Sequence, residues 1–184
     1  MRYNIHCEML HDDDVWKRLT TFIKKNGRKT HLFLMAPQPT YLKANLGFRG
    51  SVEELHTKLS RRYQMLGNAQ EKYKFKVGLH LHLSINPQVL TEQEKDHSLK
   101  YVYNWVNKHY KSQYQKDTDT IAFGWFKYDK YIEDVCKANK IKIINDEWST
   151  ITLHDYDLPL NNKKVFEKWL RMVLRKLKGQ KANA

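Results

Sequence analysis

Gly78-Leu79-His80-Leu81-His82-Leu83-Ser84 alternates polar and apolar residues, and this stretch decides both the fold and the candidate site. Residues two apart in a strand point to the same side and lie about 6.6 Å apart. His80 and His82 therefore share one face, and the leucines share the other. The apolar run begins at Phe75 and ends before Asn86-Pro87. We predict a strand over residues 75–85 that carries two imidazoles near its carboxyl end.

The segments on either side alternate between strand and helix patterns. Strands are predicted at 2–9, 31–35, 120–125, 141–144 and 150–153, and helices after Asp12, from Ser51, from Thr91, over 128–139 and over 161–178. A loop through Gly47 and Gly50 is expected before Ser51. Such alternation implies right-handed crossovers and a mostly parallel sheet with helices outside. Both a doubly wound sheet and a small, irregular (β/α) barrel fit this order.

Length and composition favour one folded domain over residues 1–184. Hydrophobic residues make up 41% of the chain, which excludes a disordered protein. Cys7 and Cys136 lie far apart within apolar stretches, so we expect buried free thiols in a reducing compartment. No segment approaches the roughly 20 apolar residues of a membrane span, and the first residues do not resemble a signal peptide. The sequence thus predicts a cytoplasmic protein without a membrane partner.

The net charge of +13 raises the question of a polyanionic partner. Residues 161–184 hold eight basic side chains against the single acid Glu167. Nucleic-acid binding is therefore the alternative function. No Gly-rich phosphate loop, zinc-finger spacing or RNA-binding strand motif is present, and the apolar stripe of the basic C-terminal helix at 161–178 indicates docking onto the domain.

Two further predicted strands end in side chains of the same chemistry. His6 and Glu8 lie on the polar face of the first strand, and His154 and Asp155 end the last one. Carboxyl ends of parallel strands meet at one edge of the sheet. We therefore expect these groups to join the two histidines of the quoted stretch, unless they are separate hydrogen-bonded histidines.

One carboxylate and two imidazoles with open coordination positions suit a hydrolytic metal ion. The sequence predicts a divalent metal held by Glu8, His80 and His82, with Asp12 or Ser84 as substitutes if the strand register is shifted. A separate histidine can then donate a proton to a leaving group.

The order of these motifs resembles the polysaccharide deacetylase superfamily. The resemblance spans residues 3–155 and rests on the acidic first strand, the Gly-Leu-His-Leu-His-Leu stretch, the helix opening at Leu90-Thr91-Glu92-Gln93-Glu94-Lys95, an aromatic-Gly-aromatic strand and a late Leu-His-Asp. It implies a distorted or incomplete (β/α) barrel, a divalent metal, often zinc, and removal of acetyl groups from carbohydrates. By this resemblance Glu8 takes the place of the carboxylate ligand, His80 that of the first histidine ligand and His154 that of the general acid.

Three positions depart from the family pattern. His6 stands where the family has its general-base aspartate, and Ser84 stands where its second histidine ligand is common, so His82 has to substitute. The strand at 121–126 lacks the arginine that orients the base. These changes imply altered hydrolysis or a binding protein on the same fold.

The predicted reaction is hydrolysis of an acetamido group on an N-acetylated sugar. His6 is the expected base, His154 the expected acid, and Trp125 and Phe126 form an expected platform for a sugar ring, unless these two aromatic side chains belong to the core. Other metal-dependent (β/α) hydrolases also carry a His-x-His strand. In those enzymes it is usually the first strand, whereas here it is the third, which favours the deacetylase interpretation.

Overall fold

The computed structural model describes residues 2–83, 87–113, 115, 118–145 and 150–158, together with residues 167, 170, 173 and 174. Its strands are β1 (Arg2–Cys7), β2 (Thr30–Met35), β3 (Lys76–Leu81), β4 (Thr120–Phe123), β5 (Lys142–Ile143) and β6 (Thr150–His154). Its main helices are α1 (Asp13–Asn26), α2 (Pro39–Leu46), α3 (Val52–Tyr73), α4 (Glu92–His109) and α5 (Lys130–Ala138).

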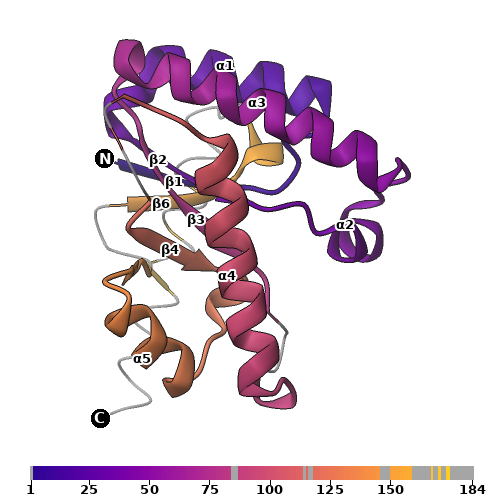
Figure 1. Cartoon of the computed structure of the whole chain (residues 1–184). Helices are drawn as coiled ribbons and strands as arrows, with labels where there is room; N and C mark the ends of the chain where they lie inside the picture. The colour runs from indigo at the N-terminus through magenta and orange to yellow at the C-terminus, as the bar shows by residue number, and fades with distance from the viewer. Residues whose placement is uncertain are drawn as a thin grey trace.

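All strand pairs are parallel, in the order β5-β4-β3-β2-β1-β6. The sheet curls into a half-barrel with helices around it, and α1 and α3 lie side by side over its outer face (Figure 1). Among the described residues β5 and β6 do not pair, so the barrel is incomplete there. This arrangement confirms the predicted distorted or incomplete (β/α) barrel with mostly parallel strands.

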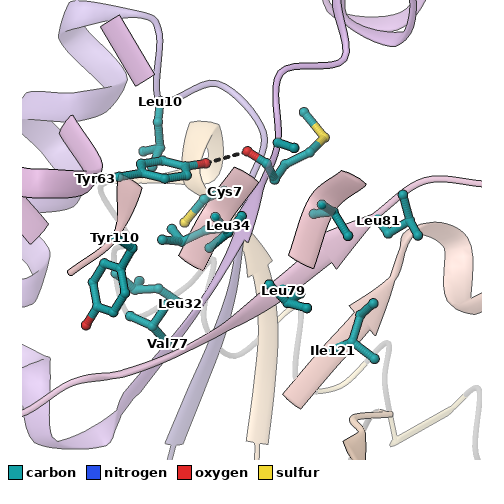
Figure 2. Packing of buried hydrophobic residues seen from close by; sticks show 14 of the residues in the cluster. Cys7, Leu10, Leu32, Leu34, Tyr63, Val77, Leu79, Leu81, Tyr110 and Ile121 are labelled. Carbon is teal, nitrogen blue, oxygen red and sulfur yellow. Dashed lines mark hydrogen bonds between the residues drawn. The ribbon is translucent and has the colours of Figure 1, made fainter. Parts of the chain in front are cut away.

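The outer face of the half-barrel and the helices form the hydrophobic core. Alternate strand residues such as Leu32, Leu34 and Leu79 are fully buried there (Figure 2). The hydroxyl of Tyr63, on α3, donates a hydrogen bond to the carbonyl of Met35 at the end of β2, drawn as the dashed line in Figure 2. The other set of alternate residues faces inward and is largely polar.

Side-chain caps fix the helix starts as the sequence predicts. Asp12 accepts a hydrogen bond from the backbone N–H of Val15 at the start of α1. Ser51 with Glu54, and Thr91 with Glu94, form capping boxes at α3 and α4. Helix α2 occupies the region where a loop was expected, beginning at Pro39 and ending at Gly47, which has a left-handed backbone (φ 66°).

Four strands were predicted to end too far along the chain. β1 ends at Cys7 instead of residue 9, so Glu8 follows the strand instead of lying on its polar face, and β5 ends at Ile143 instead of residue 144. β3 ends at Leu81 instead of residue 85, and residues 84–86 lie outside the described part. β4 ends at Phe123 instead of Trp125, because Gly124–Phe126 forms a 3-10 turn in which Trp125 takes a positive φ of 53°. At the ends of β3 and β4 the chain thus leaves the sheet earlier than predicted, and it continues over the carboxyl edge.

Other expectations have mixed outcomes. Both cysteines are buried and free, as predicted. The basic C-terminal helix expected at 161–178 lies almost entirely outside the described residues. Within the described residues, no helix combines the length and the apolar character that a bilayer crossing requires.

Candidate metal centre

Three side chains converge at the carboxyl edge of the half-barrel. Glu8 follows β1, His80 is the penultimate residue of β3, and His82 follows β3. Nε2 of His80 lies 3.0 Å from Nε2 of His82 and 3.1 Å from Oε1 of Glu8, and the third side of this triangle, His82 Nε2 to Glu8 Oε1, measures 2.9 Å. All three side chains are buried. The structure therefore brings the three predicted ligands together.

A backbone contact sets the orientation of His80 and the role of one ring nitrogen. Its Nδ1 lies 2.8 Å from the carbonyl oxygen of Ala122, on β4. A carbonyl can only accept, so Nδ1 carries a proton, and Nε2 is the ring nitrogen left to bind a cation in the cluster. This is the outer-shell contact that commonly orients a metal-binding histidine.

Glu8 is held in its ionised form. Burial raises its pKa, but hydrogen bonds with His80 and His82 outweigh burial and hold the pKa of Glu8 well below its usual range. The hydroxyl of Tyr41, on α2, donates a hydrogen bond of 2.9 Å to Oε2 of Glu8. Oε1 thus remains free to face the two imidazoles, and Tyr41 fixes the direction of the carboxylate.

The ring of His82 lies between two aromatic side chains and a glycine. Tyr41 stacks on it at 4.1 Å between centroids, and Trp125 meets it edge-on at 4.6 Å. A Cβ at Gly124 would lie 2.0 Å from Nδ1 of His82, so the ring fills the space a side chain there would need. Burial lowers the pKa of His82, which keeps the imidazole neutral at pH 7.

Two more histidines border the cluster. The His6 ring packs against that of His80 at 4.3 Å between centroids and is buried. Burial, together with the neighbouring His80 and His154, holds the pKa of His6 well below 6.5. Nε2 of His154 lies 3.5 Å from Oε1 of Glu8, and 37% of the His154 side chain is exposed. Of the four histidines at this cluster, His154 is thus the one open to solvent.

Asp155 stabilises the backbone at this edge of the half-barrel. Its carboxylate accepts hydrogen bonds from the backbone N–H groups of Met9 and Tyr156, which fixes the turn after Glu8. The residue is fully buried, and this burial raises its pKa to about 7. The Tyr156 ring stacks on His154 at 4.9 Å and orients it.

The donor set fits a divalent cation. Glu8 Oε1 and His80 Nε2 are both acceptors, so without a proton or cation between them their 3.1 Å contact is repulsive. Donor atoms about 2.0–2.2 Å from one ion lie roughly 2.8–3.1 Å apart at right angles and roughly 3.3–3.6 Å apart at tetrahedral angles, so the triangle fits three ligands on one face of the ion. Donors of His6, Glu8 and His80 also lie within 4.8 Å of one another, a looser set than the one completed by His82.

The fold has solved relatives with little sequence in common. A family 4 carbohydrate esterase from Streptomyces lividans, solved with acetate, superposes with a TM-score of 0.58 at 10% identity over 96% of this chain and 88% of that chain. The chain has the family 4 carbohydrate esterase fold. No protein-family model matches the sequence, and no curated protein matches it either.

Pseudoenzymes share this esterase fold. A CE4 family pseudoenzyme from Bacillus anthracis matches with a TM-score of 0.55 at 14% identity, over 97% of this chain and 60% of that chain. A mutant of the same pseudoenzyme, described as having restored enzymatic activity, matches equally well at 13% identity. The esterase fold confirms the resemblance to polysaccharide deacetylases at the level of architecture.

The remaining predicted residues lie in different places. Asp12 caps α1 and is not part of the cluster, which rules it out as a substitute ligand in this arrangement. Ser84 and the side chain of Phe126 are outside the described part of the chain. Trp125 lies beside His82 with 44% exposure. It is therefore not a core residue.

Sequence reasoning missed the contact of Tyr41 with Glu8. Tyr41 lies on the unpredicted helix α2, where no spacing signal pointed to Glu8. Asp155 was expected among the groups at this edge, but its carboxylate bonds to the backbone and does not face the triangle. The inner position of β4 is Ala122, and Gly124 follows the strand, so neither presents an arginine to the cluster.

Proposed function

We propose that this chain is a divergent metal-dependent hydrolase that removes an acetyl group from an N-acetylated sugar. The observation that carries the proposal is the triangle of Glu8 Oε1, His80 Nε2 and His82 Nε2, with all sides at 2.9–3.1 Å and His80 Nδ1 hydrogen bonded to Ala122. The esterase fold supports it, since the triangle lies at the carboxyl edge, where (β/α) barrels place their chemistry.

Glu8, His80 and His82 would hold the metal, and their one carboxylate and two imidazoles favour zinc. When bound, such an ion supplies a Lewis acid that polarises the acetyl carbonyl and lowers the pKa of water. Tyr41 keeps the carboxylate of Glu8 aimed at this position. The carbonyl of Ala122 accepts from Nδ1 of His80 and thereby keeps Nε2 of His80 aimed at the same position.

His154 is the proposed general acid. Among the histidines of the cluster, its side chain is the one exposed to solvent, and stacking on Tyr156 holds the ring beside Glu8. A substrate amide approaching from solvent would meet this imidazole, which can protonate the departing amine. An amine is a poor leaving group without that proton.

His6 is the proposed base, in place of the aspartate that the resemblance implies. Its low pKa leaves a neutral imidazole with a lone pair at pH 7, which can accept a proton from the attacking water. The ring is only 4% exposed, so it is reached only from the cluster. The segment 121–126 offers no arginine to orient this base, and weaker positioning of the base predicts slow turnover.

Trp125 is the proposed platform for the sugar ring, together with Phe126. The exposed face of Trp125 adjoins His82, so a sugar stacked on it would bring its acetamido group close to the cluster. N-acetylated oligosaccharides are therefore the substrates to test.

The test joins metal binding to acetate release. Protein freed of metal and reloaded with zinc is assayed on N-acetylated oligosaccharides, alongside His80→Asn, His154→Gln and, as a matched control, His97→Gln on the exposed face of α4. We expect His80→Asn to lose zinc and activity, and His154→Gln to keep zinc but lose about 10²-fold or more in kcat. Equal acetate release from all four proteins would refute the proposal.

A His6→Asp variant tests the base separately. If imidazole is the weak point of the reaction, the carboxylate raises kcat while zinc affinity changes little. Zinc binding without acetate release in both wild type and His6→Asp would assign the chain to the non-catalytic members of this fold.

A further inference from the structure

A second hollow lies at the opposite end of the half-barrel, where the strands begin. Its volume is about 640 Å³. It is lined by residues at the starts of all six strands and by the segments that lead into them. No part of the candidate metal centre lines it.

Cationic side chains surround this hollow. They come from β1, from the turn before β2, from the start of β3 and the residues before it, and from β5: Arg2, Arg28, Lys29, Lys74, Lys76 and Lys142. Asp119 is the only acidic residue in the lining. Six positive charges and one negative charge give a formal charge of +5.

The strand register explains this clustering. His31 is level with Lys76 on one side and with Asn4 on the other, and Thr120 is level with Lys142. Because parallel strands start at one edge, the cations at the starts of β1, β3 and β5 and those in the segments before β2 and β3 come to the same rim. The floor within the ring is uncharged and polar, formed by the inner-face residues Asn4, His31 and Thr120.

Most of these charges are uncompensated. Across the described ranges, Arg2, Arg28, Lys29, Lys76 and Lys142 form no ion pair with any described residue. Burial first, and then the charge of Lys76, lowers the pKa of His31 on the floor to about 4. The positive potential therefore reaches into the hollow.

We propose that this hollow is a binding site for a small anion carrying two or more phosphate groups. Like charges around a concave surface repel one another, and a multivalent anion would relieve that repulsion while gaining charge-assisted hydrogen bonds. The volume lies within the roughly 300–1,000 Å³ of small-molecule pockets. The concave shape and the polar floor favour a compact ligand over an extended RNA strand.

This site is independent of the metal centre. Lys76 and His82 are six residues apart on one extended segment, which places their Cα atoms roughly 20 Å apart. The layer of Phe33, His6 and His80 separates the two ends along the inner face.

The test is calorimetric titration of the full chain with inorganic tripolyphosphate. EDTA is present throughout, so that metal-bound phosphate cannot contribute, and the salt is about 0.15 M KCl to screen loose surface attraction. The double variant Arg2→Gln/Lys76→Gln is compared with Lys17→Gln/Lys137→Gln, which removes the same charge from exposed positions on α1 and α5.

We expect one site per chain, at least about tenfold weaker in the pocket variant and changed less than about twofold in the control. We also expect the Tm of the pocket variant without ligand to rise, because repulsion falls. Equal weakening in both variants, or no saturable binding, would overturn the proposal. Tight binding of a short single-stranded RNA that tripolyphosphate does not displace would overturn it in favour of an extended nucleic-acid surface.

Discussion

His80 points Nε2 toward Glu8 across 3.1 Å, because its other ring nitrogen donates to the carbonyl of Ala122. A bare imidazole nitrogen and a carboxylate oxygen are both acceptors, so this contact needs a proton or a cation between the two atoms. A proton there makes the contact a hydrogen bond that keeps Glu8 ionised, and a metal ion would replace that proton.

Glu8→Gln tests this arrangement. The amide oxygen can still accept from Tyr41, and the amide N–H can donate to the ring nitrogens of His80 and His82. Zinc affinity should fall at least about 100-fold, more than is usual for loss of an outer-shell partner, while the Tm of the metal-free protein should fall, because the charge-assisted hydrogen bonds that hold Glu8 ionised are lost. Isothermal titration and thermal unfolding measure both. Glu53→Gln, an exposed control on α3, should change neither.

Tyr41→Phe should weaken zinc binding by about 10-fold. The substitution keeps the ring that stacks on His82 and removes only the hydroxyl that donates to Oε2 of Glu8. Competition with a zinc chelator gives the affinity. An unchanged affinity would show that Tyr41 does not orient the carboxylate.

Gly124→Ala should lower zinc affinity by displacing the ring of His82. A methyl group at this position would lie 2.0 Å from Nδ1 of His82. Gly47→Ala is the contrasting variant, because its Cβ meets nothing within 4 Å but its φ of 66° strains any other residue. It should cost about 1 kcal/mol of stability with no change in zinc affinity. Similar affinities for both variants would contradict the predicted role of Gly124.

His31 should make the fold sensitive to acid. Its pKa is about 4 in the folded chain and about 6.5 when unfolded, so the unfolded chain takes up the proton first as the pH falls. The contribution is complete above pH 6.5 and decreases toward pH 4, by up to about 3 kcal/mol. His31→Gln should flatten the decline of the unfolding free energy between pH 6.5 and 4, whereas His97→Gln should not. Urea unfolding over this range provides the measurement.

The sequence predicted most strands and helices because their signals are local. Alternation in residues 2–9, the continuous apolar run before Pro37 and the capping residues Ser51 and Thr91 each indicate one element. The alternation of strands and helices then predicts a mostly parallel sheet, whereas the choice of an incomplete barrel over a doubly wound sheet came from the family resemblance. Helix α2 was not predicted, because it is short and because Pro37 and Pro39 indicated a loop.

The cluster was predictable in part for the same reason. His80 and His154 lie at the ends of strands, Glu8 and His82 directly follow strands, and parallel strands bring their carboxyl ends to one edge. Tyr41 reaches Glu8 through a tertiary contact across 33 positions, which no spacing rule encodes. The cationic hollow was also missed, because its charges are scattered along the chain and only the strand register brings them together.

The two faces of the half-barrel separate folding from chemistry. On β1, Ile5 and Cys7 pack into the core, while Asn4 and His6 face the interior. Selection can therefore exchange inner residues, and gain or abolish a reaction, without disturbing the packing that keeps the chain folded. On such a scaffold a few substitutions on the inner face can separate an active protein from an inactive one. The fold itself persists after most sequence similarity has been lost.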